Sequence, residues 1–189
     1  MKKIRISYNA PVSLTFTILA LAATVAGIIT DGLTTGMLFS VYRSSLRDPL
    51  FYLRLFTHVL GHSGVSHFTG NFTLFLLLAP MVENKFGSKK LFWMILFTAG
   101  ITGILNVLLF PNVSLRGASG LVFMLIILAA YSLVRTEGIP LTFILVAVVY
   151  IGNEVLGGLT LKDNVSQFAH ILGGLCGGGF GFFLCNRKN

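Results

Sequence analysis

A serine and a histidine stand at the beginning of two apolar stretches of this sequence. Ser119 lies in the run Arg-Gly-Ala-Ser-Gly at 116–120 and is followed directly by apolar residues 121–130, while His170 precedes a glycine-rich apolar stretch. Nucleophilic and ionisable groups are costly at membrane depth, and where they occur they indicate function. A serine with a histidine is the minimum set for covalent acyl transfer. The pattern predicts a nucleophile and a general base, provided that the fold brings them together.

The composition is that of a membrane protein. The 189 residues are 54% hydrophobic and only 11% charged, with a mean hydropathy of +0.85, whereas a soluble domain carries about 25% charged residues. We therefore expect one transmembrane domain over residues 1–189, without a separate soluble domain. The net charge of +8 lies mainly in the loops, as membrane topology requires, and does not indicate a nucleic-acid partner. The sequence does not indicate an oligomeric state.

Six apolar segments can be drawn, and each is long enough to cross a hydrocarbon core of about 30 Å as a helix. The segments are continuously apolar and do not alternate, which argues against the strands of a membrane barrel. The fold class predicted is an all-α membrane protein, a bundle of six transmembrane helices. The approximate helices are 11–30, 65–82, 91–110, 117–134, 139–157 and 166–185.

The distribution of lysine and arginine predicts the orientation. With the N-terminus in the cytoplasm, nine of these residues fall in inner segments and five in outer segments, Arg43, Arg47, Arg54, Arg116 and Lys162. Cytoplasmic loops carry the excess of positive charge. We therefore expect both termini in the cytoplasm, and a multi-pass protein of the bacterial inner membrane.

This topology places four polar side chains in one layer. The fourth and sixth segments both enter from the outside, so Ser119 and His170, although 51 residues apart in sequence, share a depth near the outer surface. The second segment enters from the same side and carries His67 and Asn71, whose i, i+4 spacing puts them on one helical face. Glycines at 173 and 177 form a small-residue face that lets helices approach closely, and Phe123 could pack against the imidazole of His170.

Four motifs along the chain carry a family resemblance: His62-x4-His67-x3-Asn71, Glu83-Asn84-Lys85-Phe86-Gly87-Ser88, Gly117-Ala118-Ser119-Gly120 and Ala169-His170-x2-Gly173-x3-Gly177. With these motifs, the sequence resembles the rhomboid family of intramembrane serine proteases over most of its length. One departure is visible: many members have a Trp-Arg pair in the first outer loop, where this chain has Leu53 and Arg54.

The resemblance implies a six-helix rhomboid-like bundle with a catalytic dyad of Ser119 and His170. It also implies an oxyanion and substrate-binding site that uses His67 and Asn71, with Gly117 beside them. The expected partners are transmembrane protein substrates and the lipid bilayer, and no cofactor or metal is expected. A third, carboxylate member of the catalytic set is not evident in the sequence.

Two alternatives come from other functional classes. His58 and His62, with His67 nearby, could bind zinc, but the metalloprotease pattern needs a glutamate in the segment His58-Val59-Leu60-Gly61-His62, which has none. The second alternative is a non-proteolytic rhomboid-like protein that binds membrane clients without cutting them. That class is expected to have lost the serine or the histidine, and this sequence retains both.

Overall fold

The computed structural model describes residues 7–134 and 164–186, together with single positions between 141 and 152. The fifth expected helix, 139–157, lies outside the described residues. The other five expected segments are helices whose boundaries agree with the prediction to within four residues. The described elements are α1 (Pro11–Ile29), α2 (Leu33–Leu38), α3 (Pro49–Thr57), the 3₁₀ helix η1 (His58–Leu60), α4 (Val65–Phe86), α5 (Ser88–Leu109), α6 (Ser119–Val134) and α8 (Asn164–Asn186).

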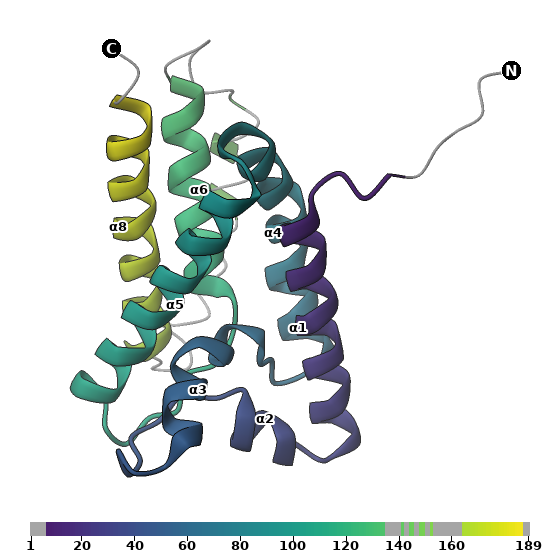
Figure 1. The fold of residues 1–189 in the computed structure, drawn as a ribbon, viewed down its shortest axis with the longest axis vertical. Helices are drawn as coiled ribbons and strands as arrows, with labels where there is room; N and C mark the ends of the chain where they lie inside the picture. The colour runs from purple at the N-terminus through teal and green to yellow at the C-terminus, as the bar shows by residue number, and fades with distance from the viewer. Residues whose placement is uncertain are drawn as a thin grey trace, which may run out of the picture.

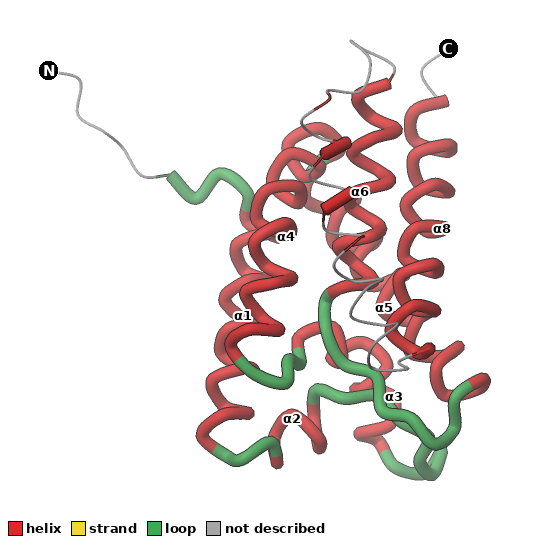
Figure 2. Tube along the Cα trace, turned by 180° about the vertical axis from the view of Figure 1, so that it is seen from behind, coloured by secondary structure: helices red, strands yellow, loops and turns green. Residues whose placement is uncertain are grey.

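α1, α4, α6 and α8 run roughly along the long axis of the molecule, α5 runs obliquely to it, and α2 and α3 lie at one end (Figure 1). Viewed from behind, the loop that leads into α6 lies at this same end (Figure 2). α6 contacts α4, α5 and α8, and its apolar residues Leu121, Val122, Leu125 and Leu128 are fully buried. α6 is therefore the central helix of the described bundle.

The outside of the bundle is as apolar as its core. Ile29, Leu175 and Phe183 are each about two-thirds exposed or more, although they lie on long helices with no covering element in the described residues. Four helices, α1, α4, α5 and α8, are long and apolar enough to cross a membrane, and α6 is a shorter apolar helix. A helix that is apolar all round in a bundle of this size is solvated by lipid.

The loop between α1 and α4 is folded rather than extended, which the sequence analysis did not predict. Asp48 begins α3 by accepting the backbone N–H of Leu50 at 2.9 Å, and Pro49 takes the first helical position. A capping aspartate followed by proline is a favoured helix start. The loop places α3 and η1 beneath the bundle, next to the beginning of α4 (Figure 1).

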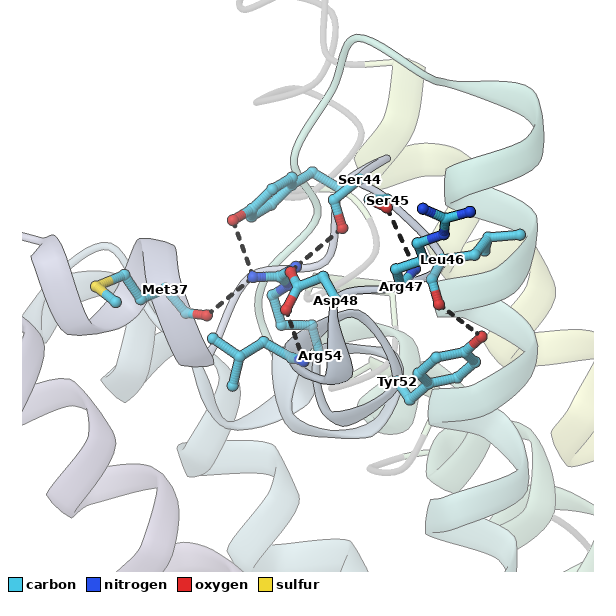
Figure 3. A network of polar contacts seen from close by, with 10 residues as sticks. Met37, Ser44, Ser45, Leu46, Arg47, Asp48, Tyr52 and Arg54 are labelled. Carbon is cyan, nitrogen blue, oxygen red and sulfur yellow. Dashed lines mark hydrogen bonds and ion pairs between the residues drawn. The ribbon is translucent and has the colours of Figure 1, made fainter.

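Arg54 holds this loop together (Figure 3). Its side chain is only 3% exposed. The guanidinium donates to the carbonyl of Met37 (3.3 Å), to Tyr42 (3.0 Å), to Ser44 (2.9 Å) and to the carboxylate of Asp48 (2.6 Å). A buried arginine requires partners of this kind, because an unpaired buried charge is strongly destabilising. The loop is thus fixed by the arginine of the Trp-Arg pair, while Leu53, in the tryptophan position, is exposed.

At the other end of the bundle, Glu83 of α4 caps α1. Its carboxylate accepts the backbone N–H groups of Val12 and Ser13, both at 2.9 Å, and the hydroxyl of Ser13 at 2.7 Å. Ala10, the cap residue of α1, offers no side-chain acceptor. The first N–H groups of a helix have no partner within it, and a carboxylate also complements the helix dipole. Glu83 therefore fixes α1 against α4.

Candidate active site

Ser119 is the first residue of α6, and the backbone conformation of the loop before it determines where this helix begins. Gly117 has φ of +120°, a conformation that favours glycine and stops a right-handed helix from extending backwards. Ala118 then accepts the first helical bond, from the N–H of Val122 at 3.0 Å. The predicted start of the segment at 117 is therefore two residues too early. The correction matters because the N–H of Ser119 has no acceptor within the helix.

Backbone contacts fix the serine loop, residues 110–118, which leads from α5 to Ser119. Leu115 and Val41 exchange two backbone hydrogen bonds of 2.9 Å, and the N–H of Gly117 donates to the carbonyl of His58 at 3.0 Å. The N–H of Ala118 donates to Nε2 of His62 at 3.4 Å. The serine is thus held by the folded segment between α1 and α4.

His58 and His62 are engaged in this scaffold through both ring nitrogens. His58 contacts the carbonyl of Arg54 through Nδ1 (3.2 Å) and the hydroxyl of Thr102 through Nε2 (3.3 Å). His62 contacts the carbonyl of Leu60 through Nδ1 (3.1 Å), and its Nε2 binds the serine loop. η1 ends at Leu60, so the two histidines do not form the helical i, i+4 pair that a zinc site would need.

Within residues 7–134 and 164–186, no group of three or more His, Cys, Asp or Glu side chains could hold a metal ion. The two histidines considered for zinc instead contact Arg54, Leu60, Thr102 and Ala118. A metal at either ring would have to displace one of these contacts. The geometry therefore favours a structural role for both histidines.

Burial keeps both histidines neutral and makes the fold sensitive to acid. Burial lowers the pKa of His58 and of His62 from 6.5 to about 4. Between these values the unfolded chain binds protons that the folded chain does not, so the free energy of unfolding falls as the pH falls. The expected loss from pH 7 to pH 5 is on the order of 2 kcal/mol for each histidine.

This prediction is checked by unfolding the purified protein in detergent at pH 7 and pH 5. His62→Gln cannot titrate, so its stability is expected to change less between the two pH values than that of the native protein. Equal pH dependence in both proteins would show that His62 is not the group concerned.

His67 is oriented toward the serine loop by Ser63. Its Nδ1 accepts the backbone N–H of Ser63 at 3.4 Å and lies 3.2 Å from the Ser63 hydroxyl. A neutral imidazole that accepts at Nδ1 carries its proton on Nε2. A β-carbon placed on Gly117 would lie 2.9 Å from this Nε2. The donor side of His67 therefore faces the residue two positions before Ser119, and only glycine leaves room for it.

Asn71 follows His67 by one helical turn and is 2% exposed. Its side-chain amide donates to the carbonyl of His67 at 3.0 Å. This bond lies along α4 and fixes the rotamer of the amide. It joins Asn71 to the turn that carries His67, so the two residues lie on one face of α4, as their spacing predicted.

Glycines bring α6 and α8 into backbone contact. A β-carbon on Gly173 would clash with the carbonyl group of Gly120, and one on Gly177 would clash with the carbonyl of Met124. A β-carbon on Gly120 would lie 3.2 Å from the carbonyl oxygen of Ala169. The close approach predicted from Gly173 and Gly177 is confirmed. It places the residues that follow Ser119 directly against those on either side of His170.

His170 packs against α6 one turn beyond the serine. Its ring stacks on that of Phe123, with 4.4 Å between centroids and 10° between planes, as the sequence analysis suggested. Ser119 is 7% exposed and His170 is 6% exposed. A buried serine at a helix N-terminus, a buried histidine on the adjoining helix and a histidine donor facing the same loop are the parts that acyl transfer requires.

The comparison with known families agrees with this geometry. A sequence model of the Rhomboid domain matches residues 50–187, which is more than half of the chain and runs from α3 to α8. The chain belongs to the rhomboid family. No curated protein matches it.

Membership in the rhomboid family, together with the apolar helices, makes this chain an integral, multi-pass membrane protein that acts within a lipid bilayer. Rhomboid proteins are typically intramembrane serine proteases, although inactive members also exist. The matched region contains Ser119, His170, His67 and Asn71, whereas α1 and α2 precede it.

The sequence analysis missed the residues that support the rhomboid site. His58 was considered only as a metal ligand, His62 as a metal ligand and as part of a family motif, and Arg54 as an outer charge and part of a loop motif. His58 contacts Thr102 and His62 contacts Ala118, both far away in sequence, while Arg54 contacts residues within its own loop. The one signal in the sequence that could have indicated these roles was the high density of polar residues just before the second apolar segment, because a membrane span does not require polar residues there.

Proposed function

We propose that this protein is an intramembrane serine endopeptidase that cuts transmembrane substrate proteins with a dyad of Ser119 and His170. The observation that carries the proposal is the approach of α6 and α8, in which Gly173 meets Gly120 and Phe123 stacks on His170. Phe123 lies one turn from Ser119 on α6, so the histidine stands beside the helix end that carries the serine.

The reaction proceeds in two halves. The hydroxyl oxygen of Ser119 attacks the peptide carbonyl carbon while His170 takes the hydroxyl proton. The tetrahedral intermediate then collapses, the C–N bond breaks, and His170 returns the proton to the leaving amine. A water molecule attacks the resulting ester in the same way, with His170 again as the base, and releases the carboxylate product and the free serine.

Three donors surround the position of the oxyanion. The N–H of Ser119 stands at the positive end of the α6 dipole, and Nε2 of His67 faces the same loop across Gly117. Asn71, one turn beyond His67 on α4, supplies the third donor through its side-chain amide. Donors fixed in advance at such a site stabilise the transition state more than the substrate.

Removing one of these side-chain donors is expected to slow cleavage without abolishing it. His67→Ala and Asn71→Ala should each reduce the rate by on the order of 10²–10³, because the backbone N–H of Ser119 remains. Initial rates on a transmembrane substrate in detergent measure the effect, with Thr73→Ala, an exposed site on the same helix, as the control. Cleavage by Asn71→Ala at the native rate would leave Asn71 a packing residue.

The alternative is a rhomboid-like protein that binds membrane clients without cutting them. Both the serine and the histidine are retained, which supports the peptidase. Reaction of the purified protein with a serine-directed fluorophosphonate separates the two functions, because a client-binding protein needs no activated serine. A folded protein that neither labels nor cleaves a transmembrane substrate would favour client binding.

We further propose a single six-helix rhomboid domain over residues 1–189, in the bacterial inner membrane with both termini in the cytoplasm. α6 and α8 run in the same direction (Figure 1), and two parallel neighbouring crossings require a return crossing between them. The expected segment 139–157 supplies it. The ends of α4, α6 and α8 that carry the site then face the outside, where water reaches them.

Reporter fusions test this topology. Fusions after Lys90 and Arg135 should report a cytoplasmic location, and a fusion after Asp163 should report an external one, since the lysine and arginine excess lies on the inner side. Alkaline phosphatase activity, with a cytoplasmic fluorescent reporter as the complement, measures each position. A cytoplasmic signal after Asp163 would invert the depth at which the site is proposed to lie.

A further inference from the structure

A polar cavity of about 410 Å³ opens beside the proposed active site without including its dyad. It is bounded by the end of α1, the turn into α2, the residues before α4 and the loop before α6. Its lining differs from that of an apolar cavity between α5 and α8 and of another between α1 and α5, because it includes both an acidic and a basic side chain. The polar lining residues are Asp31, Thr35, His62, Ser63 and Arg116.

Arg116 is fixed in this cavity by the backbone on both of its sides. Leu115 before it is bound to Val41, and Gly117 after it donates to the carbonyl of His58. The side chain of Arg116 is exposed, whereas Leu115 and Gly117 are buried. Arg116 therefore lines the open cavity as an exposed residue of a fixed loop, three residues before the proposed nucleophile.

The other polar walls connect the cavity to the proposed oxyanion site. Ser63 lines the cavity and orients the ring of His67, while His62 lines it and binds the N–H of Ala118. A peptide bound at Ser119 must be extended for its carbonyl to be attacked, and an extended chain advances at most about 3.5 Å per residue. A substrate side chain about three residues from the cut bond can therefore reach the cavity.

The geometry points to this cavity as a substrate subsite in which Arg116 binds an anionic side chain, Asp or Glu, a few residues from the cut bond. The inference rests on the proposed peptidase function. Arg116 offers a planar set of donors that fits a carboxylate. Asp31 also lines the cavity and disfavours a second negative charge in it.

The outer location also favours an anion. In the proposed orientation the cavity faces the outside, and the outer flanks of transmembrane segments are poor in lysine and arginine. A subsite that depended on Asp31 to bind a cation would meet few suitable substrates there. Arg116, which lies in the serine loop, therefore determines the selectivity for the charge of the substrate side chain, and Asp31 modulates it.

A charge-swap experiment tests the inference. The probe is a transmembrane peptide with a known cut site, prepared with Glu, Gln or Lys at each of the five positions on either side of the cut bond. At one position the native protein is expected to prefer Glu over Lys in kcat/KM by about fivefold, the range of an exposed ion pair. Arg116→Glu should invert this preference, and Asp31→Asn should increase the preference for Glu.

Arg47→Glu is the matched control, since Arg47 is an exposed arginine of the outer loop that does not line the cavity. It should keep the native preference. Raising the salt concentration should reduce the selectivity of the native protein, because screening weakens exposed pairs, while cleavage of the Gln peptide serves as the reference.

Three results would overturn the inference. In the first, the native protein and Arg116→Glu cleave all peptides in the same order. In the second, the native protein prefers Lys at the selective position and the Asp31→Asn variant lacks that preference. In the third, Arg47→Glu inverts the preference as Arg116→Glu does. Each of these leaves the peptidase function intact, because the peptides are still cut. Failure of every variant and of the native protein to cut the Gln peptide would instead reject the proposed function, and with it the subsite that depends on it.

Discussion

Replacing Ser119 by alanine is expected to reduce cleavage of a transmembrane substrate to background, and replacing His170 by alanine is expected to do the same. Ser119→Ala removes the nucleophile and leaves His170 nothing to activate. His170→Ala leaves a hydroxyl that stays protonated at neutral pH and attacks poorly. Residues that act as a unit are not additive, so the double variant should be no slower than either single one.

Covalent labelling distinguishes the two single variants. A fluorophosphonate should label the native protein, label His170→Ala weakly and fail to label Ser119→Ala. Cleavage and labelling should persist in the presence of a strong chelator, since His58 and His62 are engaged in the scaffold. Substantial cleavage by purified Ser119→Ala would reject the serine mechanism, and loss of activity on chelation, restored by zinc, would favour a metal site.

Replacing Gly173 by alanine is expected to have the next largest effect, although Gly173 takes no part in the chemistry. A β-carbon there would clash with the carbonyl group of Gly120, which is backbone and cannot rotate away. α6 and α8 must therefore separate, and His170 moves relative to Ser119. A displacement of about 1 Å in a catalytic pair can cost on the order of a hundredfold in rate, so we expect a loss of this size in kcat/KM.

Gly179→Ala is the control for this variant. It lies on the same helix, and a β-carbon there would meet nothing within 4 Å, so activity should stay close to native. Labelling by the fluorophosphonate should fall in Gly173→Ala in parallel with cleavage, while the unfolding transition still shows a folded protein. Native rates in Gly173→Ala would contradict the close approach of α6 and α8 as the feature that forms the site.

The loop between α1 and α4 shows why one departure from the family pattern has little effect on the fold. Leu53 replaces the tryptophan of the usual pair, but the loop is held by Arg54 through Met37, Tyr42, Ser44 and Asp48 (Figure 3). Leu53 is exposed and takes no part in that network. The aromatic residue is therefore replaceable in the folding of the loop, whereas the arginine is not.

The sequence by itself determined the helical segments, the family and the candidate site residues. A backbone in lipid must satisfy its hydrogen bonds internally, so long apolar segments become helices whatever surrounds them, and α1, α4, α5, α6 and α8 could be placed within a few residues. The spacing of Gly173 and Gly177 likewise predicted a close helix contact, because the lack of a β-carbon at both positions can be read directly from the sequence. Ser119, His170, His67 and Asn71 were all identifiable as candidate site residues at this level.

Tertiary structure alone decided what the other polar residues do. The spacing of His58 and His62 allowed a metal site, and only their contacts with Thr102 and Ala118, residues 44 and 56 positions away, show that they support the serine loop. The start of α6 depended on Gly117, whose left-handed backbone is held by His58 and leaves room for His67. Such roles arise from burial and hydrogen bonds between distant segments, and those partners are chosen by packing, which no local pattern of residues encodes.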